Sequence, residues 1–195
     1  MVSHLHLIAS IVIGALLLLA ILNLNSTMSA RSYEYTLDNL VRETTASIAE
    51  ILCRDFRRIG AGLPNPATSI ISCTSNSIQF LADLDADGTP EQVSYTLSDS
   101  TAPSNTPNPR DRYLYRQINN GPQVEIGAGI IDFRLDYYTR QGTPNPTDFT
   151  AIRCIEIQLT VESTMACEVD GRPYYARNYW QTKIAPPNLR GTAGG

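Results

Sequence analysis

The sequence predicts an α+β protein in which one long N-terminal helix packs against an antiparallel β-sheet head. Three observations support this fold class. The segment from Leu7 to Leu22, LIASIVIGALLLLAIL, is sixteen residues long and contains no charge and no proline. Apolar residues then recur every three or four positions from Leu37 to Ile59, as on one face of a helix. After Gly60 and Gly62 the apolar spacing changes to every second residue, which is typical of half-buried strands.

Residues 1–30 are expected to form a retained hydrophobic helix for anchoring and assembly. Its apolar core, from Leu5 to Leu24, spans ~30 Å at ~1.5 Å per residue, about the thickness of a bilayer core. A cleaved signal peptide is an alternative, but the first six residues lack Lys and Arg, and a cut after Ala30 would place Met28 at the minus-three position. Both interpretations export the head, whereas a third, a buried core helix, leaves it in the cytoplasm. The expected assembly positions are Leu7, Ile11, Leu17, Leu18 and Leu22.

Residues 31–62 are expected to continue this helix as an amphipathic segment. Glycines at 60 and 62 and prolines at 64 and 66 supply the stop signal. Three arginines, Arg54, Arg57 and Arg58, share the helix end with Asp55. Cations are favoured at the negative pole of a helix, so we interpret this cluster as a solvated helix end.

Residues 63–185 are expected to form the antiparallel head, and residues 186–195 a flexible tail. The apolar sets that alternate with polar residues are Val93, Tyr95 and Leu97; Ile131, Phe133, Leu135 and Tyr137; and Ile155, Ile157, Leu159 and Val161. Shorter candidate strands are 77–81, 113–118 and 174–184. One wet face per strand indicates a single antiparallel sheet, and the apolar stripe of the helix is the element long enough to cover its other face.

Composition and charge argue against two classes of function. A net charge of -4 and a pI near 5.1 do not favour binding to nucleic acid, which requires a basic surface. Lys183 is the only lysine, and the other fourteen basic residues are arginines. The two histidines, His4 and His6, belong to the anchor, so no Ser-His-Asp arrangement forms in the head. We therefore expect a protein that is not an enzyme.

One motif has the chemistry of a metal site. Asp83, Asp85 and Asp87 are spaced by two and followed by Gly88, like the first half of a calcium-binding EF-hand loop. The twelfth position of such a loop should be a glutamate but is Ser94, while Glu91 at the ninth position can contribute. Calcium bound by Asp83, Asp85, Asp87 and Glu91 is one interpretation, and an acidic turn between two strands is the other. No further cofactor is expected.

The four cysteines, Cys53, Cys73, Cys154 and Cys167, suggest two disulfides in an exported head. Three connectivities are open, and we expect Cys53–Cys73 and Cys154–Cys167. No pair has the spacing of a zinc knuckle. By strand parity, Cys154 lies on the wet face with Glu156 and Gln158, where it is placed to tether an outer segment such as residues 165–169.

Taken together, the chain resembles the type IV pilin and type II secretion pseudopilin superfamily. The apolar helix, its amphipathic continuation, the glycine-rich break and the antiparallel head carry the resemblance, and the segments FLADLDADGTPEQVSYTL (80–97) and IIDFRLDYY (130–138) resemble the larger minor pilins. The chain departs from the family at Leu5, where members carry a glutamate, and in lacking a Gly-Phe leader junction. This departure suits a minor, initiating or divergent subunit better than a major pilin.

The resemblance implies a structural subunit of a pilus-like or pseudopilus-like filament. Its partners would be other pilin-like subunits and the membrane. Its location would be the inner membrane and periplasm and then an extracellular filament or the cell surface. The Cys154–Cys167 pair resembles the C-terminal disulfide region of pilins. The alternative function is a solitary anchored or secreted binding or adhesion module, for which Tyr174, Tyr175, Tyr179 and Trp180 would offer an aromatic surface; such residues are also ordinary in strands.

Overall fold

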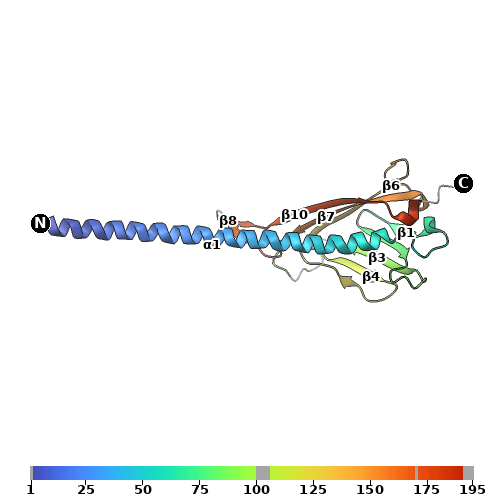
Figure 1. Ribbon diagram of the computed structural model, residues 1–195, viewed down its shortest axis with the longest axis horizontal. Coiled ribbons are helices and arrows are strands. Elements are labelled where there is room, and N and C mark those ends of the chain that lie inside the picture. Colours follow the sequence, from blue (N-terminus) through green and yellow to red (C-terminus); the bar gives the residue numbers. More distant parts are fainter. Residues whose placement is uncertain (1, 100–105, 170, 191–195) are drawn as a thin grey trace.

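The computed structural model describes residues 2–99, 106–169 and 171–190, with side chains from residue 6 onward. Helix α1 (Val2–Arg57) runs unbroken for 56 residues, ~84 Å at the standard rise. It projects from the head like a rod, with the N-terminus at its free end and the C-terminal residues at the opposite end of the molecule (Figure 1). The predicted continuous helix is confirmed, and it ends two residues before Ile59.

Glycines end the helix as the sequence indicates. Gly60 and Gly62 have φ values of 79° and 75°, a left-handed conformation that costs glycine little. A Cβ atom on Gly62 would lie 2.8 Å from the Cβ atom of Asp83, so this turn also allows the close approach of the acidic loop. The chain therefore turns back toward the strands immediately after α1.

The head contains two larger antiparallel sheets and a small one. The first has the order β1 (Ile70–Cys73), β2 (Ser77–Ala82), β3 (Glu91–Leu97), β4 (Leu114–Ile118) and β5 (Val124–Glu125). The second has the order β10 (Arg177–Ile184), β7 (Ile152–Glu162) and β6 (Ile130–Thr139). Strands β8 (Cys167–Val169) and β9 (Arg172–Tyr174) pair with each other. Short 3-10 helices occupy Pro66–Thr68, Phe149–Ala151 and Pro187–Arg190.

The fold class is confirmed, but the single sheet is wrong. Strand β7 pairs with β6 on one side and with β10 on the other. These three strands form a sheet that is separate from the sheet of β1–β5. The stretch 174–184 is also divided, because Tyr175 and Ala176 separate β9 from β10. Helix α1 packs mainly on β10 and β7, and the apolar faces of both larger sheets meet it in one core.

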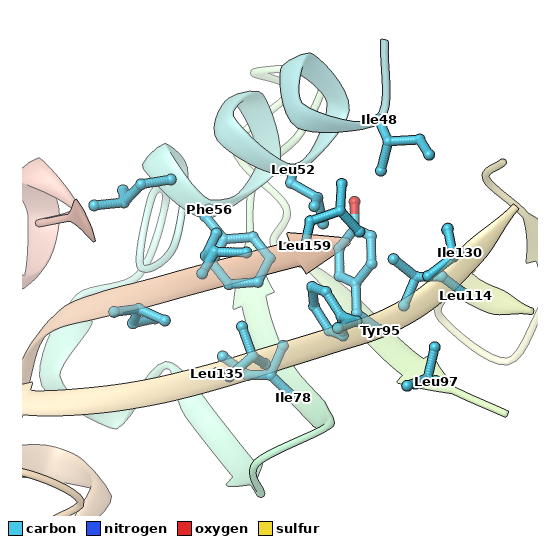
Figure 2. Packing of buried hydrophobic residues seen from close by; sticks show 14 of the residues in the cluster. Ile48, Leu52, Phe56, Ile78, Tyr95, Leu97, Leu114, Ile130, Leu135 and Leu159 are labelled. Atoms are coloured by element: carbon cyan, nitrogen blue, oxygen red, sulfur yellow. The ribbon is translucent and has the colours of Figure 1, made fainter. Parts of the chain in front are cut away.

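The core is built around the C-terminal part of α1. Ile48, Leu52 and Phe56 enter it from the helix and meet Ile78, Tyr95 and Leu97 of the first sheet and Leu135 and Leu159 of the second (Figure 2). The ring centroids of Phe56 and Phe80 are 5.6 Å apart in an edge-to-face arrangement. The predicted helical stripe is largely buried, but Leu40 is 52% exposed and Ile51 is half-buried.

Strand parity is confirmed for the apolar residues except at the start of β6, but Glu156 and Glu162, which we expected on the wet face of β7, are only 7% and 1% exposed. Phe133, Leu135 and Tyr137 are buried as expected, but a register shift between Ile130 and Asp132 turns Ile130 into the core. Ile131, which we expected in the buried set, is half-buried instead. A β-bulge reverses parity locally, and the sequence does not mark its position.

The C-terminal residues differ from the expected flexible tail. Residues 187–190 form a 3-10 helix whose Leu189 is 2% exposed. The side-chain amide of Asn188 donates a hydrogen bond of 3.2 Å to the carbonyl oxygen of Ile59. The segment thus covers the end of α1. These buried contacts distinguish it from a flexible tail. The remainder of the expected tail, 191–195, lies outside the described residues.

Candidate functional site: the exposed apolar helix and the acidic loop

The N-terminal half of α1 makes no buried contact with the head. Every described side chain from His6 to Tyr33 is exposed, and Leu37 is the first buried residue of the helix. The expected assembly positions all lie on this half: Leu7, Ile11, Leu17, Leu18 and Leu22 are 55–63% exposed. Residues 6–33 therefore project from the head over ~42 Å of helix.

The projecting half is long and apolar enough to cross a membrane. Its most apolar window has a mean hydropathy of 2.8, and none of that window is buried in the protein. The hydroxyl of Ser10, within the apolar run, donates a hydrogen bond of 2.8 Å to the carbonyl oxygen of Leu7, so this polar group is satisfied within the helix. A hydrogen bond within the helix suits an apolar environment, where no water is present as a hydrogen-bond partner.

The acidic loop connects β2 to β3 at the same end of the head as the C-terminus of α1. Two residues in it have positive φ, Ala86 at 66° and Gly88 at 89°. Its backbone is held by carboxylates: Asp83 Oδ1 accepts from Ala86 N at 2.6 Å, and Asp83 Oδ2 accepts from Gly88 N at 3.0 Å. Glu91 Oε2 accepts from Leu84 N at 2.8 Å. These bonds curl the loop around its acidic side chains.

The loop brings together three of the four expected ligands. Carboxylate oxygens of Asp83, Asp85 and Glu91 lie within 4.8 Å of one another. Asp87 is not in this group, and its Oδ1 accepts a hydrogen bond of 2.7 Å from Thr89 N instead. Each carboxylate oxygen has a second lone pair, so the existing hydrogen bonds leave coordination sites on the three converging groups. The arrangement fits a hard cation such as Ca²⁺ and also fits an acidic turn.

The arginine cluster at the helix end is only partly solvated, contrary to our interpretation. The guanidinium of Arg58 donates to the carbonyl oxygen of Leu84 and lies 3.5 Å from that of Asp83, which ties the acidic loop to α1. Asp55 is 1% exposed. Arg54 and Arg57 are exposed as expected. The helix end is thus a junction with the head.

Asp55 belongs to a buried polar group that the sequence did not indicate. Its Oδ2 accepts hydrogen bonds from the hydroxyl of Tyr95, at 2.6 Å, and from Nε of Arg116, at 2.7 Å. Burial, followed by the neighbouring Asp55 carboxylate, raises the pKa of Tyr95 above its ordinary value. The partners are 40 and 61 residues away in sequence, so local pattern carries no signal for this contact.

A second buried polar group fixes the segment before β4. Glu162 accepts hydrogen bonds from Nε of Arg177 at 2.8 Å and from Nδ2 of Asn108 at 3.0 Å. It also forms an ion pair with Nη2 of Arg110 at 2.8 Å. Nearby, Asp111 is 5% exposed and its Oδ1 has no hydrogen-bond partner. Burial raises the pKa of Asp111, and the Glu162 charge adds to that effect. We expected only a polar loop here, and residues 100–105 of that loop lie outside the described residues.

The expected disulfides are not formed, since all four cysteines are unpaired. The pairing of Cys154 with Cys167 is wrong for a geometric reason. Cys154 lies near the start of β7 opposite Tyr138, whereas Cys167 in β8 lies beyond the other end of β7, close to the charges of Glu34 and Asp38. These are opposite ends of the head (Figure 1), and a disulfide requires Cα atoms within about 7 Å.

The other expected pair is also absent. Cys53 lies on α1 near Arg57, and Cys73 ends the edge strand β1 beside Tyr137. Burial raises the pKa of both thiols, which makes them less reactive at neutral pH. The Cys53–Cys73 link, which we expected to hold the helix end to the first strand, is thus not present, and both cysteines are free thiols.

The four aromatic residues do not form one surface. Tyr179 is 55% exposed, but Trp180 packs against the core cluster and Tyr174 joins it in part. The guanidinium of Arg110 lies 5.3 Å from the ring centroid of Tyr175. These side chains serve mainly as sheet and loop contacts, which weakens the case for an aromatic adhesive face.

A scan against protein-family models finds no matching family, and a search of curated proteins finds no match.

Proposed function

We propose that this chain is a structural subunit of a pilus-like or pseudopilus-like filament. The supporting observation is that α1 is one unbroken helix whose C-terminal part is packed in the head while its apolar part is exposed. An exposed apolar surface of this size requires lipid or other helices to cover it. Lipid covers the helix in the inner membrane before assembly, and the helices of other pilin-like subunits, of this or a related sequence, cover it in an extracellular or cell-surface filament.

Photo-crosslinking distinguishes a filament subunit from a solitary anchored module. A benzoylphenylalanine at Leu18 is compared with one at Tyr35, which lies on the same helix beyond the apolar run and is 70% exposed. In cells of the source organism, a filament subunit gives crosslinks from position 18 to other pilin-like chains, identified by mass spectrometry. A solitary module gives crosslinks from position 18 to lipid alone, which would contradict the proposal.

Deletion of residues 1–30 provides a second test. The shortened chain retains the buried contacts of α1, which begin at Leu37, so the head remains folded. We expect it to be soluble and excluded from filaments. Entry of this shortened chain into filaments would refute assembly through the apolar helix.

The acidic loop has a second, separate role in this proposal as a calcium site. The favouring observation is the convergence of Asp83, Asp85 and Glu91. A bound Ca²⁺ would offset the repulsion of three close carboxylates and would stiffen the β2–β3 connection beside the end of α1.

A further inference from the structure

Three arginines converge on one hollow at the end of the head that lies farthest from the N-terminus. Arg140, Arg153 and Arg190 line a hollow of about 320 Å³ together with Thr139, Cys154 and Ala185. They come from the end of β6, the start of β7 and the C-terminal 3-10 helix. Segments far apart in sequence therefore deliver the same functional group to one place.

These arginines have no carboxylate partner within the described part of the chain. Arg54, Arg110, Arg116, Arg134 and Arg177 each form an ion pair, but Arg140, Arg153 and Arg190 form none. Lys183 lies near Cys154, and its charge is offset by Glu156, at 3.2 Å. The exposed carboxylate of Asp148 interacts electrostatically with Arg153 but forms no ion pair with it. The hollow is thus a local positive site on a chain whose net charge is -4.

Arg153 is oriented by the backbone. Its Nη1 donates to the carbonyl oxygens of Thr150 and Ile152, at 2.6 and 2.8 Å. A guanidinium held on one edge presents its remaining donors in a fixed direction, which suits two-point binding of a carboxylate. The preorganised group lowers the entropy cost of binding.

A second hollow adjoins the first through Arg153. It has a volume of about 650 Å³, and its lining is mixed: Leu63, Pro64, Pro66, Ala67 and Pro187 give it an apolar part, and Asn65 and Asn188 give it a polar part. An apolar side chain can be buried there beside a carboxylate in the arginine hollow. This combination favours a peptide over an acidic polysaccharide, which carries carboxylates but no apolar side chain.

We propose that the paired hollows bind an extended acidic peptide segment of a partner protein. Its carboxylate lies among Arg140, Arg153 and Arg190, and a neighbouring apolar side chain lies against the prolines. The carboxylate comes from an acidic side chain or from the C-terminus of the partner. The site is separate from the apolar helix, so it does not depend on filament assembly.

Fluorescence anisotropy with the full chain in dodecyl maltoside tests the site. The probes are three labelled hexapeptides containing leucine: one with two adjacent glutamates and an amidated end, one with glutamines in their place, and one without acidic side chains but with a free C-terminal carboxylate. The glutamate peptide, the free-carboxylate peptide or both should bind, and which of them binds identifies the source of the carboxylate. The glutamine peptide should bind at least about tenfold more weakly.

Arginine variants supply the control. Arg140→Ala, Arg153→Ala and Arg190→Ala should each weaken binding of the acidic probe by about five- to tenfold. Arg172→Ala removes an exposed, unpaired arginine from β9, outside the hollow, and should leave binding unchanged. Thermal unfolding confirms that each variant is folded. Failure of both carboxylate peptides to bind, equal binding of the glutamine peptide, equal losses in Arg172→Ala, or tighter binding of alginate than of either peptide would overturn the proposal.

Discussion

The hydroxyl of Tyr95, at the centre of the first sheet, donates a hydrogen bond of 2.6 Å to Asp55 on α1. Arg116 of the neighbouring strand completes the group, so a buried charge is both paired and hydrogen-bonded. This contact attaches the helix to the first sheet at one position and orientation. Because removal of one partner leaves the other charge buried, the group is sensitive to single substitutions.

Asp55→Ala should lower the free energy of unfolding by about 3 kcal/mol, since it leaves Arg116 uncompensated. Tyr95→Phe removes the hydrogen bond that the hydroxyl donates to Asp55 and the one that it accepts from Nε of Arg116, and should cost about 1–2 kcal/mol. Urea unfolding of the full chain in detergent measures both values. Glu50→Ala, an exposed acidic position on the same helix, is the matched control and should change stability by less than about 0.5 kcal/mol. A loss in Asp55→Ala no larger than in this control would contradict the assignment.

The bond between Tyr138 and Glu156 should produce a pH dependence of stability. The Tyr138 hydroxyl lies 2.6 Å from Glu156 Oε2, and this hydrogen bond is the largest cause of the lowered pKa of Glu156 and of the raised pKa of Tyr138, to about 12. A lowered carboxyl pKa gives stability that is present above the ordinary value of 4.5 and lost as pH falls through the folded value. The raised tyrosine pKa gives stability that is present below 10.0 and lost as pH rises through about 12.

Tyr138→Phe should therefore unfold at a lower temperature than wild type between about pH 5 and 10, with the difference shrinking at both extremes. Calorimetry across pH 3–12 measures this. Tyr179→Phe, on the opposite edge strand β10, is the control, because its hydroxyl donates to Gln181 rather than to a carboxylate. A constant difference across the whole pH range would refute the linkage.

Asp111→Asn should stabilise the head at neutral pH. Burial raises the pKa of Asp111. The contribution of this group to stability is therefore fully present below its ordinary pKa of 3.8 and is lost as pH rises through its pKa in the folded state. A neutral amide avoids the cost of burying the charge, and we expect a gain of about 1 kcal/mol at pH 7 that disappears near pH 3. Thermal melts at both pH values test it. A lower melting temperature for the variant at pH 7 would show that the carboxylate is required.

Calcium should raise the melting temperature through the three converging carboxylates. Asp85→Ala should abolish the rise, because a ligand stabilises only the folded state that binds it. Asp87→Ala should retain the rise, since Asp87 lies outside the converging group. If calcium raises the melting temperature of wild type and Asp85→Ala equally, the loop is an acidic turn and not a calcium site.

Leu17→Arg should impair membrane insertion. A charge near the centre of an apolar span costs about 2.5–3.5 kcal/mol on insertion scales. Tyr35→Arg, beyond the apolar run on the same helix, should insert normally. Carbonate extraction of membranes separates inserted from peripheral chains, and equal retention of both variants would argue against a membrane-spanning role for this segment.

The parts of the fold set by local pattern could be predicted from the sequence. The helical spacing to Ile59 and the alternation in β3, β6 and β7 identify most of the buried apolar side chains, with Leu40 and Ile131 as exceptions. The division into two sheets could not be predicted, because it depends on which distant strands pair. The same limit applies to Asp55 and Glu162, whose burial depends on residues far along the chain. In the acidic loop, the motif predicted Asp83, Asp85 and Glu91, which converge, and also Asp87, which the closing of the hairpin leaves outside the group.

The docking of α1 along the head has a mechanical consequence. From Leu37 to Phe56 the helix lies against strands β7 and β10, and its far end is held by Asp55 and by the Asn188–Ile59 hydrogen bond. If the head is pulled while the N-terminal half of the helix is held, the force acts parallel to this contact. Many side-chain contacts then resist the force together in shear. Tension is then shared over ~30 Å of packed helix instead of peeling one turn at a time. The head is thus built to stay attached to its rod under load.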